Sequence, residues 1–561
     1  MLTNPTLSPF ESIGLCFSGG GYRASAFSLG VLSYLQRTNF GDSILLEKVT
    51  AMSTVSGGTI TGGYYASCQA KGILFSEFFD NLYTFHNKDE LLKTALCYME
   101  EDELWKSNQK KRSLINAFSI AYDTLLQPAN MGEIDELGAS HLKYVCFNAT
   151  DFSYGLAFRF QNRGLFGNYR LYCEEIDPFR GGIRIADAIA ASSCFPMGFE
   201  PIIFPDDFRN DQPESAYQNL KEKPNFLNGV GIMDGGIVDN QGIGSMVNIN
   251  NSNDPGTPLD LIMVNDVGSY MMPPWQQDQT DLAKHGKKSL ESVFSNFLKA
   301  LSFNRYYLIT LLIGLLLILA NSMDLFFGKP WPGIYITGGV LTGMGVVLSG
   351  FGVFTSLSAR FLNYSLHNIF RNNIPSVLLS NIQGMDTLSV SLIRRMLTER
   401  LSSTFTMVNY IFLHQLRRIN YDFLYENPKN KHRLITNTVY ELNGQHQNLI
   451  KSVINKEIFG KHCERINESA LIASQMPTTL WWDDKDRKLN RLDNLVACGQ
   501  FTTCYNLMKY IDELPIGAQQ NKDIQGLRRQ LESDWNKFKQ NPRFMVDEIK
   551  PNTEQATVDS E

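Results

Sequence analysis

The sequence predicts an α/β fold in which helices cover a mostly parallel sheet, interrupted by a pair of membrane-spanning helices. Two short apolar runs, Ile13–Phe17 and Val49–Ser53, have the length and composition of buried strands. Each is followed by glycines and then by a helical pattern, the order expected of a parallel sheet with crossover helices. Much later, residues 306–359 form an interval with almost no charge. A chain of 561 residues is long enough for one large domain or two to three ordinary ones.

Composition excludes several classes of function. The formal net charge of −6 gives no reason to expect a nucleic acid partner. The nine cysteines include no C-x-x-C pair and are odd in number, so we expect reduced thiols in the cytosol rather than a disulfide framework. Residues 1–12 lack a basic region followed by an apolar run, so we expect no signal peptide.

Ser56 stands between the strand Val49–Ser53 and a predicted helix over Ile60–Gln69, and two glycines follow it directly. A serine beside glycines at a tight strand-to-helix turn is the sequence form of a nucleophile elbow, which exposes the hydroxyl above the sheet. The usual G-x-S-x-G pattern has a glycine where this chain has Thr54. The alternative is a serine that only caps an ordinary helix.

A glycine-rich turn, Ser18–Ala24 (Ser-Gly-Gly-Gly-Tyr-Arg-Ala), follows the first strand. Its backbone N–H groups would hold an anion, and two kinds of anion are open. The spacing of Gly19, Gly21 and Ala24 fits a loose dinucleotide pattern, which also needs an acidic residue at the end of the next strand. Because the next strand leads to Ser56 instead, we favour an oxyanion hole beside a nucleophile.

Asp234 ends a further apolar segment and is followed by two glycines. Glycines at these positions would let its carboxylate approach a neighbouring backbone closely. The alternative is an ordinary turn, in which Asp-Gly is common. We prefer Asp234 to Asp239 because it lies directly before the glycine pair, and we expect Asp239 to cap the turn that follows.

Taken in order, these stretches resemble the three signatures of patatin-like phospholipases, and the glycine turn is also similar to the related cytosolic phospholipases of animals. Residues 191–196 (Ala-Ser-Ser-Cys-Phe-Pro) resemble the small-residue stretch that the family carries before its aspartate. The resemblance covers residues 13–267 and extends more weakly to residues 477–480 and 494–511. Thr54 and Ala24 depart from the family pattern, which has glycine at both positions.

The resemblance implies a three-layer α/β sandwich and a Ser–Asp dyad that hydrolyses lipid esters without metal or cofactor. Carried onto this chain, Ser56 is the nucleophile and Asp234 is the base. Gly19, Gly20 and Gly21 form the implied oxyanion hole. The implied activity is that of a serine carboxylic-ester hydrolase, of the phospholipase A or lysophospholipase type, which releases a fatty acid and a lysolipid.

Several alternatives stay open. Arg23 would place a lipid phosphate, or else bond a carboxylate at the start of its helix. A histidine-containing triad would replace the dyad, although none of the eight histidines lies in a triad-like stretch. A membrane scaffold or gated pore would keep the domain for binding only. An acyltransferase would use the same dyad with an acceptor other than water.

Two uncharged segments predict a transmembrane hairpin. Tyr306–Met323 has 18 residues and would span about 27 Å, close to the thickness of a hydrocarbon core. After a short polar break, Pro332–Ala359 has 28 uncharged residues, and Gly339 and Gly343 would give it a flat packing face. We expect spans at about 306–323 and 334–358, and the alternative is a hairpin buried inside the globule.

Basic residues outside both ends of the hairpin predict its orientation. Lysines and arginines lie between positions 284 and 305 and at 360 and 371, whereas the connecting turn carries only Lys329 against Asp324. By the positive-inside rule, we expect two spans with the catalytic domain and both termini on the cytoplasmic side. The expected partners are the bilayer and its phospholipids, and the glycine face would also allow two copies to pair.

The expected domains are a catalytic domain (1–300), the hairpin (301–360), a helical segment that completes the catalytic domain (361–540) and a mobile tail (541–561). Within them we expect a solvated charged face at Glu100–Arg112 and a surface loop at 206–225. A single long helix over 388–425 packs on the catalytic core or else lies on lipid headgroups.

Overall fold

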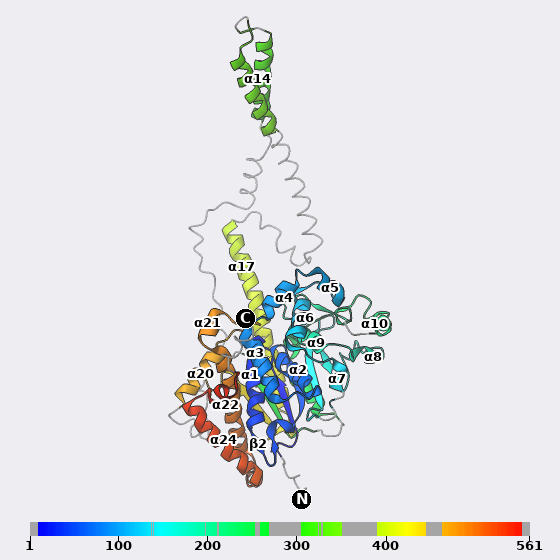
Figure 1. The fold of residues 1–561 in the computed structure, drawn as a ribbon, viewed down its shortest axis with the longest axis vertical. Helices are drawn as coiled ribbons and strands as arrows, with labels where there is room; N and C mark the ends of the chain where they lie inside the picture. The colour runs from blue at the N-terminus through cyan, green and yellow to red at the C-terminus, as the bar shows by residue number, and fades with distance from the viewer. Residues whose placement is uncertain are drawn as a thin grey trace, which may run out of the picture. The chain divides into compact units, whose positions relative to one another are not determined.

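The computed structural model describes residues 9–135, 137, 140–196, 198–209, 213–252, 258–268, 305–323, 325–326, 329–349, 390–444 and 463–551. The chain divides into two units, residues 1–273 with 409–561, and residues 274–408. Figure 1 shows the elements of both units, coloured along the chain. Each unit is described by itself.

A mixed sheet of eight strands forms the centre of the first unit, in the order β10-β9-β1-β4-β5-β8-β7 with β6 also paired to β5. The strands are β1 (Ile13–Phe17), β4 (Val49–Val55), β5 (Tyr144–Asp151), β6 (Leu156–Gln161), β7 (Ile202–Phe204), β8 (Val230–Asp234), β9 (Leu261–Asp266) and β10 (Leu434–Thr438). The pairs from β10 to β5 are parallel, and those of β6, β8 and β7 are antiparallel. The predicted mostly parallel sheet is confirmed, and the carboxyl ends of β1, β4 and β9 meet at one edge.

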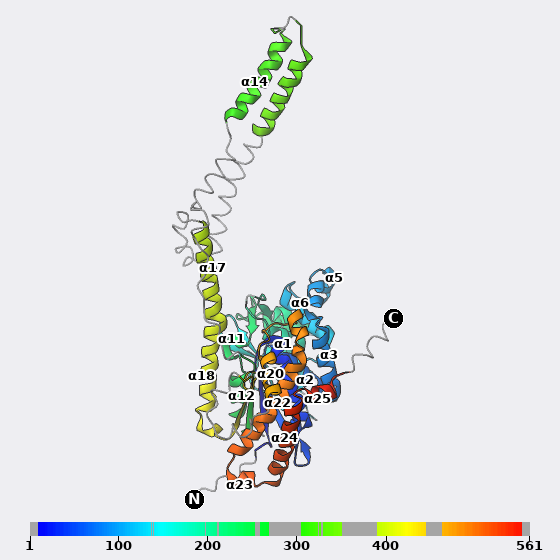
Figure 2. The same cartoon turned by 90° about the vertical axis from the view of Figure 1, so that its left-hand side faces the viewer.

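Helices cover both faces of this sheet. Alternate strand residues point to opposite faces, so Leu15 and Phe17 enter the larger hydrophobic core while Cys16 enters the smaller one. The larger core takes side chains from α1 (Gly21–Arg37), α2 (Gly57–Ala70) and α22 (Arg491–Glu513), and the smaller from α12 (Ile243–Asn250) and α18 (Leu413–Tyr425). Figure 2 shows α12 and α18 on the side of the sheet opposite α1. The result is a helix–sheet–helix arrangement.

Glycines let α1 and α22 approach closely within the larger core. A Cβ atom at Gly30 would lie 2.0 Å from the carbonyl oxygen of Val496, and one at Gly499 would lie 2.2 Å from the carbonyl oxygen of Phe27. Any side chain at either position would push the helices apart. The C-terminal part of the chain therefore packs directly on the first helix.

Further helices surround this framework. They are α3 (Phe75–Lys88), α4 (Leu91–Tyr98), α5 (Asp102–Asn108), α6 (Leu114–Leu126), α7 (Met131–Asp135), α8 (Ile176–Arg180), α9 (Ile185–Ser192), α10 (Glu214–Lys221), α11 (Gly236–Asp239), α20 (Glu464–Ser474), α21 (Asp484–Lys488), α23 (Ile516–Gln519), α24 (Lys522–Gln540) and α25 (Phe544–Ile549). The predicted surface loop 206–225 contains helix α10, whose Tyr217 and Leu220 side chains are buried. The predicted mobile tail contains helix α25, whose Met545 and Val546 side chains are buried. Residues beyond 551 lie outside the described residues.

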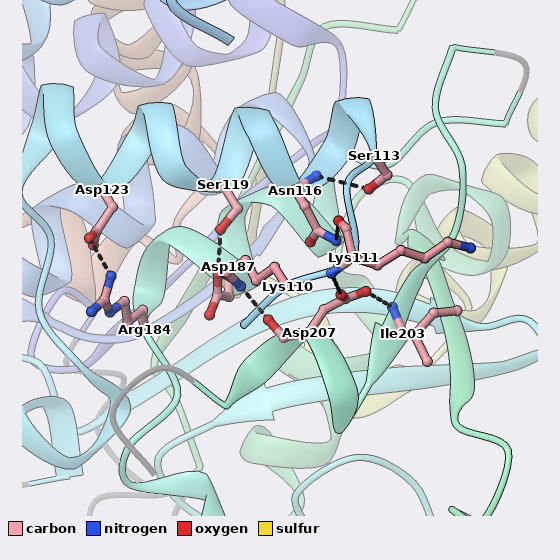
Figure 3. Close-up of polar contacts among 10 residues, drawn as sticks. All are labelled: Lys110, Lys111, Ser113, Asn116, Ser119, Asp123, Arg184, Asp187, Ile203 and Asp207. Carbon is pink, nitrogen blue, oxygen red and sulfur yellow. Dashed lines mark hydrogen bonds and ion pairs between the residues drawn. The ribbon is translucent and has the colours of Figure 1, made fainter. Parts of the chain in front are cut away.

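The charged segment 100–112, predicted as a solvated face, is partly buried (Figure 3). The Lys110 ammonium lies 2.7 Å from the carboxylate of Asp187 on α9, and both side chains are 1% exposed. Lys110 also donates a hydrogen bond to the Asp207 carbonyl, and Ser119 donates one to Asp187. The prediction was wrong at Lys110 because its buried partner is distant in the sequence and leaves no local pattern.

The long helix predicted over 388–425 is helical from Val390 onward in the described residues. It comprises α17 (Val390–Thr406), a π-helical stretch (Met407–Phe412) and α18. In α18, which belongs to the first unit, Arg417 and Leu424 are buried, whereas Ile419 and Phe423 are 60% exposed. The first of the two alternatives predicted for this helix, packing on the core, is therefore confirmed for α18.

The second unit contains two antiparallel apolar helices, α14 (Arg305–Ser322) and a helix over Pro332–Ser349. Of the residues described, Pro332–Ser349 is the one helix long and apolar enough to cross a membrane, and the apolar helix Tyr306–Ser322 is shorter than the length required. The predicted two-span topology is thus not confirmed. The end of the second predicted span, from residue 350, and the basic flanks outside Arg305 lie outside the described residues.

Glycines bring these two helices together. A Cβ atom at Gly345 would lie 2.6 Å from the Leu311 backbone, and one at Gly314 would lie 2.5 Å from the backbone nitrogen of Thr342. At Gly339 and Gly343, by contrast, a Cβ atom would meet nothing within 4 Å among the described residues. The packing face within the hairpin is therefore not the one predicted at those two positions.

Candidate active site

Ser56 stands at the turn between β4 and α2, with backbone angles of φ 50° and ψ −122°. A positive φ is unusual for serine and costs about 1–3 kcal/mol unless the surroundings hold it. The Ser56 N–H donates a hydrogen bond to the Ser192 hydroxyl at 2.8 Å, and this bond helps to hold the backbone conformation of Ser56. Ser56 is 8% exposed. The predicted strained elbow is thus the local geometry found at this serine.

The glycines after Ser56 allow the first glycine turn to lie directly against the elbow. A Cβ atom at Gly57 would lie 2.0 Å from the carbonyl oxygen of Gly21, and one at Gly58 would lie 2.7 Å from that of Ser18. A Cβ atom at Gly19 would lie 3.1 Å from the Cβ atom of Ser56. Two turns that are separate in sequence therefore meet at backbone contact distance.

Thr54 replaces the first glycine of the usual elbow pattern, and α2 accommodates it. The Thr54 hydroxyl donates to the Thr59 hydroxyl at 3.0 Å. Its methyl group lies over Gly62, where a Cβ atom would approach it to 2.5 Å. The Thr54 side chain thus points toward α2, where Gly62 leaves room for its methyl group.

Asp234 is the last residue of β8, and its buried carboxylate lies beside Ser56. The carboxylate accepts a hydrogen bond from the Gly236 N–H at 2.6 Å, and the Ser56 side chain lies within hydrogen-bonding reach of it. Burial raises the pKa of Asp234 to about 6, although Ser56 and the Gly236 N–H act to lower it. The structure therefore brings together the two side chains that the sequence singled out.

The three glycines of the first turn differ in their backbone N–H groups. The Gly19 N–H donates to the carbonyl oxygen of Asn240 at 2.9 Å. For Gly20 and Gly21, no acceptor for the N–H group is found within the described part of the chain. Both have positive φ angles, of 145° and 58°, which glycine adopts without strain. Of the three predicted donors, Gly19 is thus occupied by a protein acceptor, whereas Gly20 and Gly21 have none among the described residues.

Arg23 and the histidines lie apart from this geometry. Arg23 is buried, and its guanidinium donates to the carbonyl oxygen of Met476 at 2.8 Å. In the described residues, no hydrogen bond joins a histidine to Ser56 or Asp234. His86 bonds the Ser25 hydroxyl at 2.8 Å, and burial lowers its pKa to about 3. His141 bonds the Tyr65 hydroxyl at 2.8 Å.

Two supporting residues were not assigned a role from sequence. Ser192 accepts from the Ser56 N–H and donates to the Asn148 carbonyl at 2.6 Å, which fixes the elbow to β5. It lies in the small-residue stretch 191–196, so a signal was present. Asn240 holds Gly19, and nothing in the local sequence marks it. Asp239 accepts the Gly244 N–H at 2.6 Å, so its predicted capping role is confirmed.

No group of three or more His, Cys, Asp or Glu residues is placed to hold a metal ion within the ranges described. The arrangement at the sheet edge offers a hydroxyl, a carboxylate and two backbone donors. Together these can attack a carbonyl carbon, accept a proton and stabilise a developing oxyanion.

A family model identifies the class of domain to which part of the chain belongs. Residues 15–247, which include Ser56 and Asp234, match the family model "Patatin-like phospholipase". No curated protein matches the chain. Among solved structures, human GIVD cytosolic phospholipase A2 matches with 14% identity and a TM-score of 0.30, and the match covers 47% of each chain, about half of that protein's length. Residues 15–247 of this chain are a patatin-like phospholipase domain.

Proposed function

We propose that this protein is a membrane-anchored lipid acyl hydrolase that cleaves ester bonds of phospholipids or lysophospholipids with a Ser56–Asp234 dyad. The observation that carries the proposal is the position of the Ser56 side chain, which lies within hydrogen-bonding reach of a buried carboxylate whose pKa is raised to about 6. Such a carboxylate is a stronger base than an exposed aspartate and is still mostly ionised at neutral pH.

In the first half of the proposed reaction, the Ser56 oxygen attacks the ester carbonyl carbon while Asp234 takes the hydroxyl proton. The N–H groups of Gly20 and Gly21 stabilise the oxyanion, and each such donor is typically worth about 3 kcal/mol of barrier. The N-terminus of α2 adds a favourable field for the negative charge. Asp234 then gives its proton to the departing lysolipid or alcohol oxygen, which leaves an acyl group on Ser56.

In the second half, water attacks the acyl-enzyme with Asp234 again acting as base. Asp234 then returns the proton to the Ser56 oxygen as its bond to the acyl group breaks, and a fatty acid is released. Acyl transfer to an alcohol would use the same residues with a different acceptor. For Arg23, we propose that the buried guanidinium ties α1 to Met476 and that a substrate phosphate would contact it only after that hydrogen bond breaks.

The membrane anchor in this proposal is the helix pair α14 and Pro332–Ser349, with the catalytic unit on the cytoplasmic side. Support comes from the large apolar side chains that the pair leaves exposed, which are Leu308, Ile309, Leu312, Ile313, Leu315, Leu316, Leu319, Ile336, Val340, Met344, Val346 and Val347. An exposed apolar surface of this extent is unusual on a soluble protein. Asn321 and Trp331 close the turn through hydrogen bonds of 3.0 and 3.1 Å.

The dyad is tested with full-length protein in detergent or nanodiscs and a fluorescent phospholipid ester. We expect Ser56→Ala and Asp234→Asn each to lower turnover by at least about 10⁴-fold. Ser67→Ala, a matched change elsewhere on α2, should leave turnover unchanged, because the Ser67 hydroxyl only donates to the Gly63 carbonyl. Wild-type turnover in Ser56→Ala would refute the dyad, and an acylated alcohol as the main product would favour the transferase.

Topology is tested by labelling single cysteines in intact cells with a membrane-impermeant maleimide. Lys329→Cys lies in the turn between the two helices, whereas Cys97 is an exposed native thiol of the catalytic unit. We expect Lys329→Cys to react from outside the cell and Cys97 to react only after permeabilisation. Reaction of both from one side would rule out the two-span anchor.

A further inference from the structure

A buried ion pair lies next to the glycine turn. Arg417 on α18 donates to one carboxylate oxygen of Asp266, the last residue of β9, through its Nε at 2.7 Å and its Nη2 at 2.6 Å. The Tyr421 hydroxyl at 2.8 Å and the Gln241 side-chain amide at 3.2 Å donate to the same oxygen, and the Gly268 N–H donates to the other at 2.8 Å. Burial alone would raise the pKa of Asp266, but Arg417 and these donors lower it below its ordinary value.

The neighbours of Asp266 hold the glycine turn directly. The Asn265 carbonyl accepts the Ser18 N–H at 3.0 Å, and the Val267 N–H donates to the Ser18 hydroxyl at 3.0 Å. The Val267 side chain also packs on Gly20, where a Cβ atom would approach it to 2.6 Å. The position of Asp266 therefore sets the position of the first residues of the turn.

A second connection from α18 reaches the other side of the turn. Gln241, which donates to Asp266, follows Asn240, whose carbonyl holds the Gly19 N–H at 2.9 Å. Asn420, three residues after Arg417, donates to the Asp239 carboxylate at 3.1 Å. Helix α18 therefore makes hydrogen bonds to Asp266 and to Asp239, in the two segments that border Gly19 and Gly20.

Arg417 and Asp266 lie close in the sequence to the two ends of the inserted unit. The chain leaves the first unit after Pro273 and re-enters it at Asn409, so Asp266 and Arg417 stand a few residues from the two ends of the inserted unit. Gly268 makes room for the contact, because a Cβ atom there would lie 2.3 Å from the Arg417 guanidinium. The pair therefore joins the two chain segments of the first unit that flank residues 274–408 in the sequence.

We propose that Arg417, Tyr421 and Asp266 are positioning residues for the reaction: they hold the glycine turn so that the Gly20 and Gly21 N–H groups face the oxyanion. The proposal rests on the proposed hydrolase function. A carboxylate with five donors has a fixed orientation, and fixed orientation is the best-supported use of a buried ion pair, since such pairs contribute little net stability. Small displacements of an oxyanion donor are costly to catalysis.

The central test compares two tyrosine hydroxyls on α18. Tyr421→Phe removes the hydrogen bond to Asp266, while Tyr425→Phe removes one to the Thr436 hydroxyl, away from the glycine turn. With full-length protein in detergent and a water-soluble short-chain ester, Tyr421→Phe should lower kcat about tenfold with little change in KM or Tm. Tyr425→Phe should stay within about twofold of wild type.

Arg417→Lys extends the test, because lysine keeps the charge but cannot donate from two atoms of one planar group. We expect kcat to fall on the order of 100-fold while the protein still folds, and Arg417→Met to be worse. Wild-type kcat in both Tyr421→Phe and Arg417→Lys would overturn the proposal.

Hydrogen exchange separates this inference from the hydrolase proposal. Tyr421→Phe should speed exchange of the Gly19 and Tyr22 amides, which donate to the carbonyl oxygens of Asn240 and Thr479, at least fivefold relative to wild type, and Tyr425→Phe should not. If wild-type protein proves inactive on every ester, the hydrolase proposal fails and exchange still decides whether α18 holds the turn. Unchanged exchange in Tyr421→Phe would overturn the positioning role, whatever the activity.

Discussion

The side chain of Ser56 lies within hydrogen-bonding reach of the carboxylate of Asp234, the last residue of β8. That carboxylate is buried, and its pKa is raised to about 6. No histidine bonds either group in the described parts of the chain. If the proposed dyad is correct, the proton that leaves Ser56 during attack has Asp234 as its acceptor.

The raised pKa of Asp234 predicts an acidic limit to activity. The base must be ionised to accept the Ser56 proton, so kcat/KM should be constant above pH 7 and fall about tenfold per pH unit below pH 6. The measurement is kcat/KM for a soluble ester between pH 4.5 and 8, at pH values where the Tm shows the protein to be folded. A profile that stays flat down to pH 5 would contradict the assignment of Asp234 as base.

Gly57→Ala should disrupt the elbow. The new Cβ atom would lie 2.0 Å from the Gly21 carbonyl oxygen, so the glycine turn must move away from Ser56. We expect kcat to drop by at least about 100-fold, the effect of losing one oxyanion donor. Gly526→Ala on α24 is the control: no atom lies within 4 Å of its Cβ position in the described structure, so activity should persist and stability should rise slightly. Equal activity of the two variants would argue against contact between the turns.

Two ion pairs in Figure 3 should differ in their effect on stability. Asp187→Asn leaves Lys110 as a buried charge without its ion-pair partner and should lower the free energy of unfolding by about 3–5 kcal/mol. Asp123→Asn removes the partner of Arg184, where the side chains are 30% and 25% exposed, and should cost less than about 1 kcal/mol. Denaturant unfolding of both variants provides the comparison, and similar losses would mean that Lys110 is solvated.

The glycines of the helix pair offer a matched comparison. Gly345→Leu would place its side chain against the Leu311 backbone, at 2.6 Å from its Cβ position, whereas Gly343→Leu would point into open space. We therefore expect Gly345→Leu to separate α14 from Pro332–Ser349 and Gly343→Leu to leave them together. Disulfide cross-linking between cysteines introduced on the two helices would report the separation. If Gly343→Leu reduces cross-linking instead, Gly343 lies at the interface.

Local sequence was sufficient for the features that depend on neighbouring residues. The elbow at Ser56, the glycine turn and the cap at Asp239 each combine a strand end with residues a few positions away. A short stretch of sequence is therefore enough to predict their geometry. The parallel order of β1 and β4 followed from the same alternation of strand and helix.

Contacts between distant segments left no such pattern. Lys110 appeared to be one charge in a polar run. It is buried because its ion-pair partner, Asp187, lies 77 positions further along the chain. Gly339 and Gly343 were chosen by spacing alone, whereas the face that meets α14 contains Gly345. Arg417 is one of two adjacent arginines in the predicted helix 388–425, and only its partner, 151 positions away, makes it part of the structure around Gly19 and Gly20.

The sequence by itself determined the class of domain and the two side chains with the right chemistry, because strand, glycine and helix signals act over a few residues. The tertiary structure alone decided which glycine amides stay open, which aspartate is desolvated and which charges are buried. These properties depend on what the chain packs against each group, and the packing partners come from segments that are remote in the sequence.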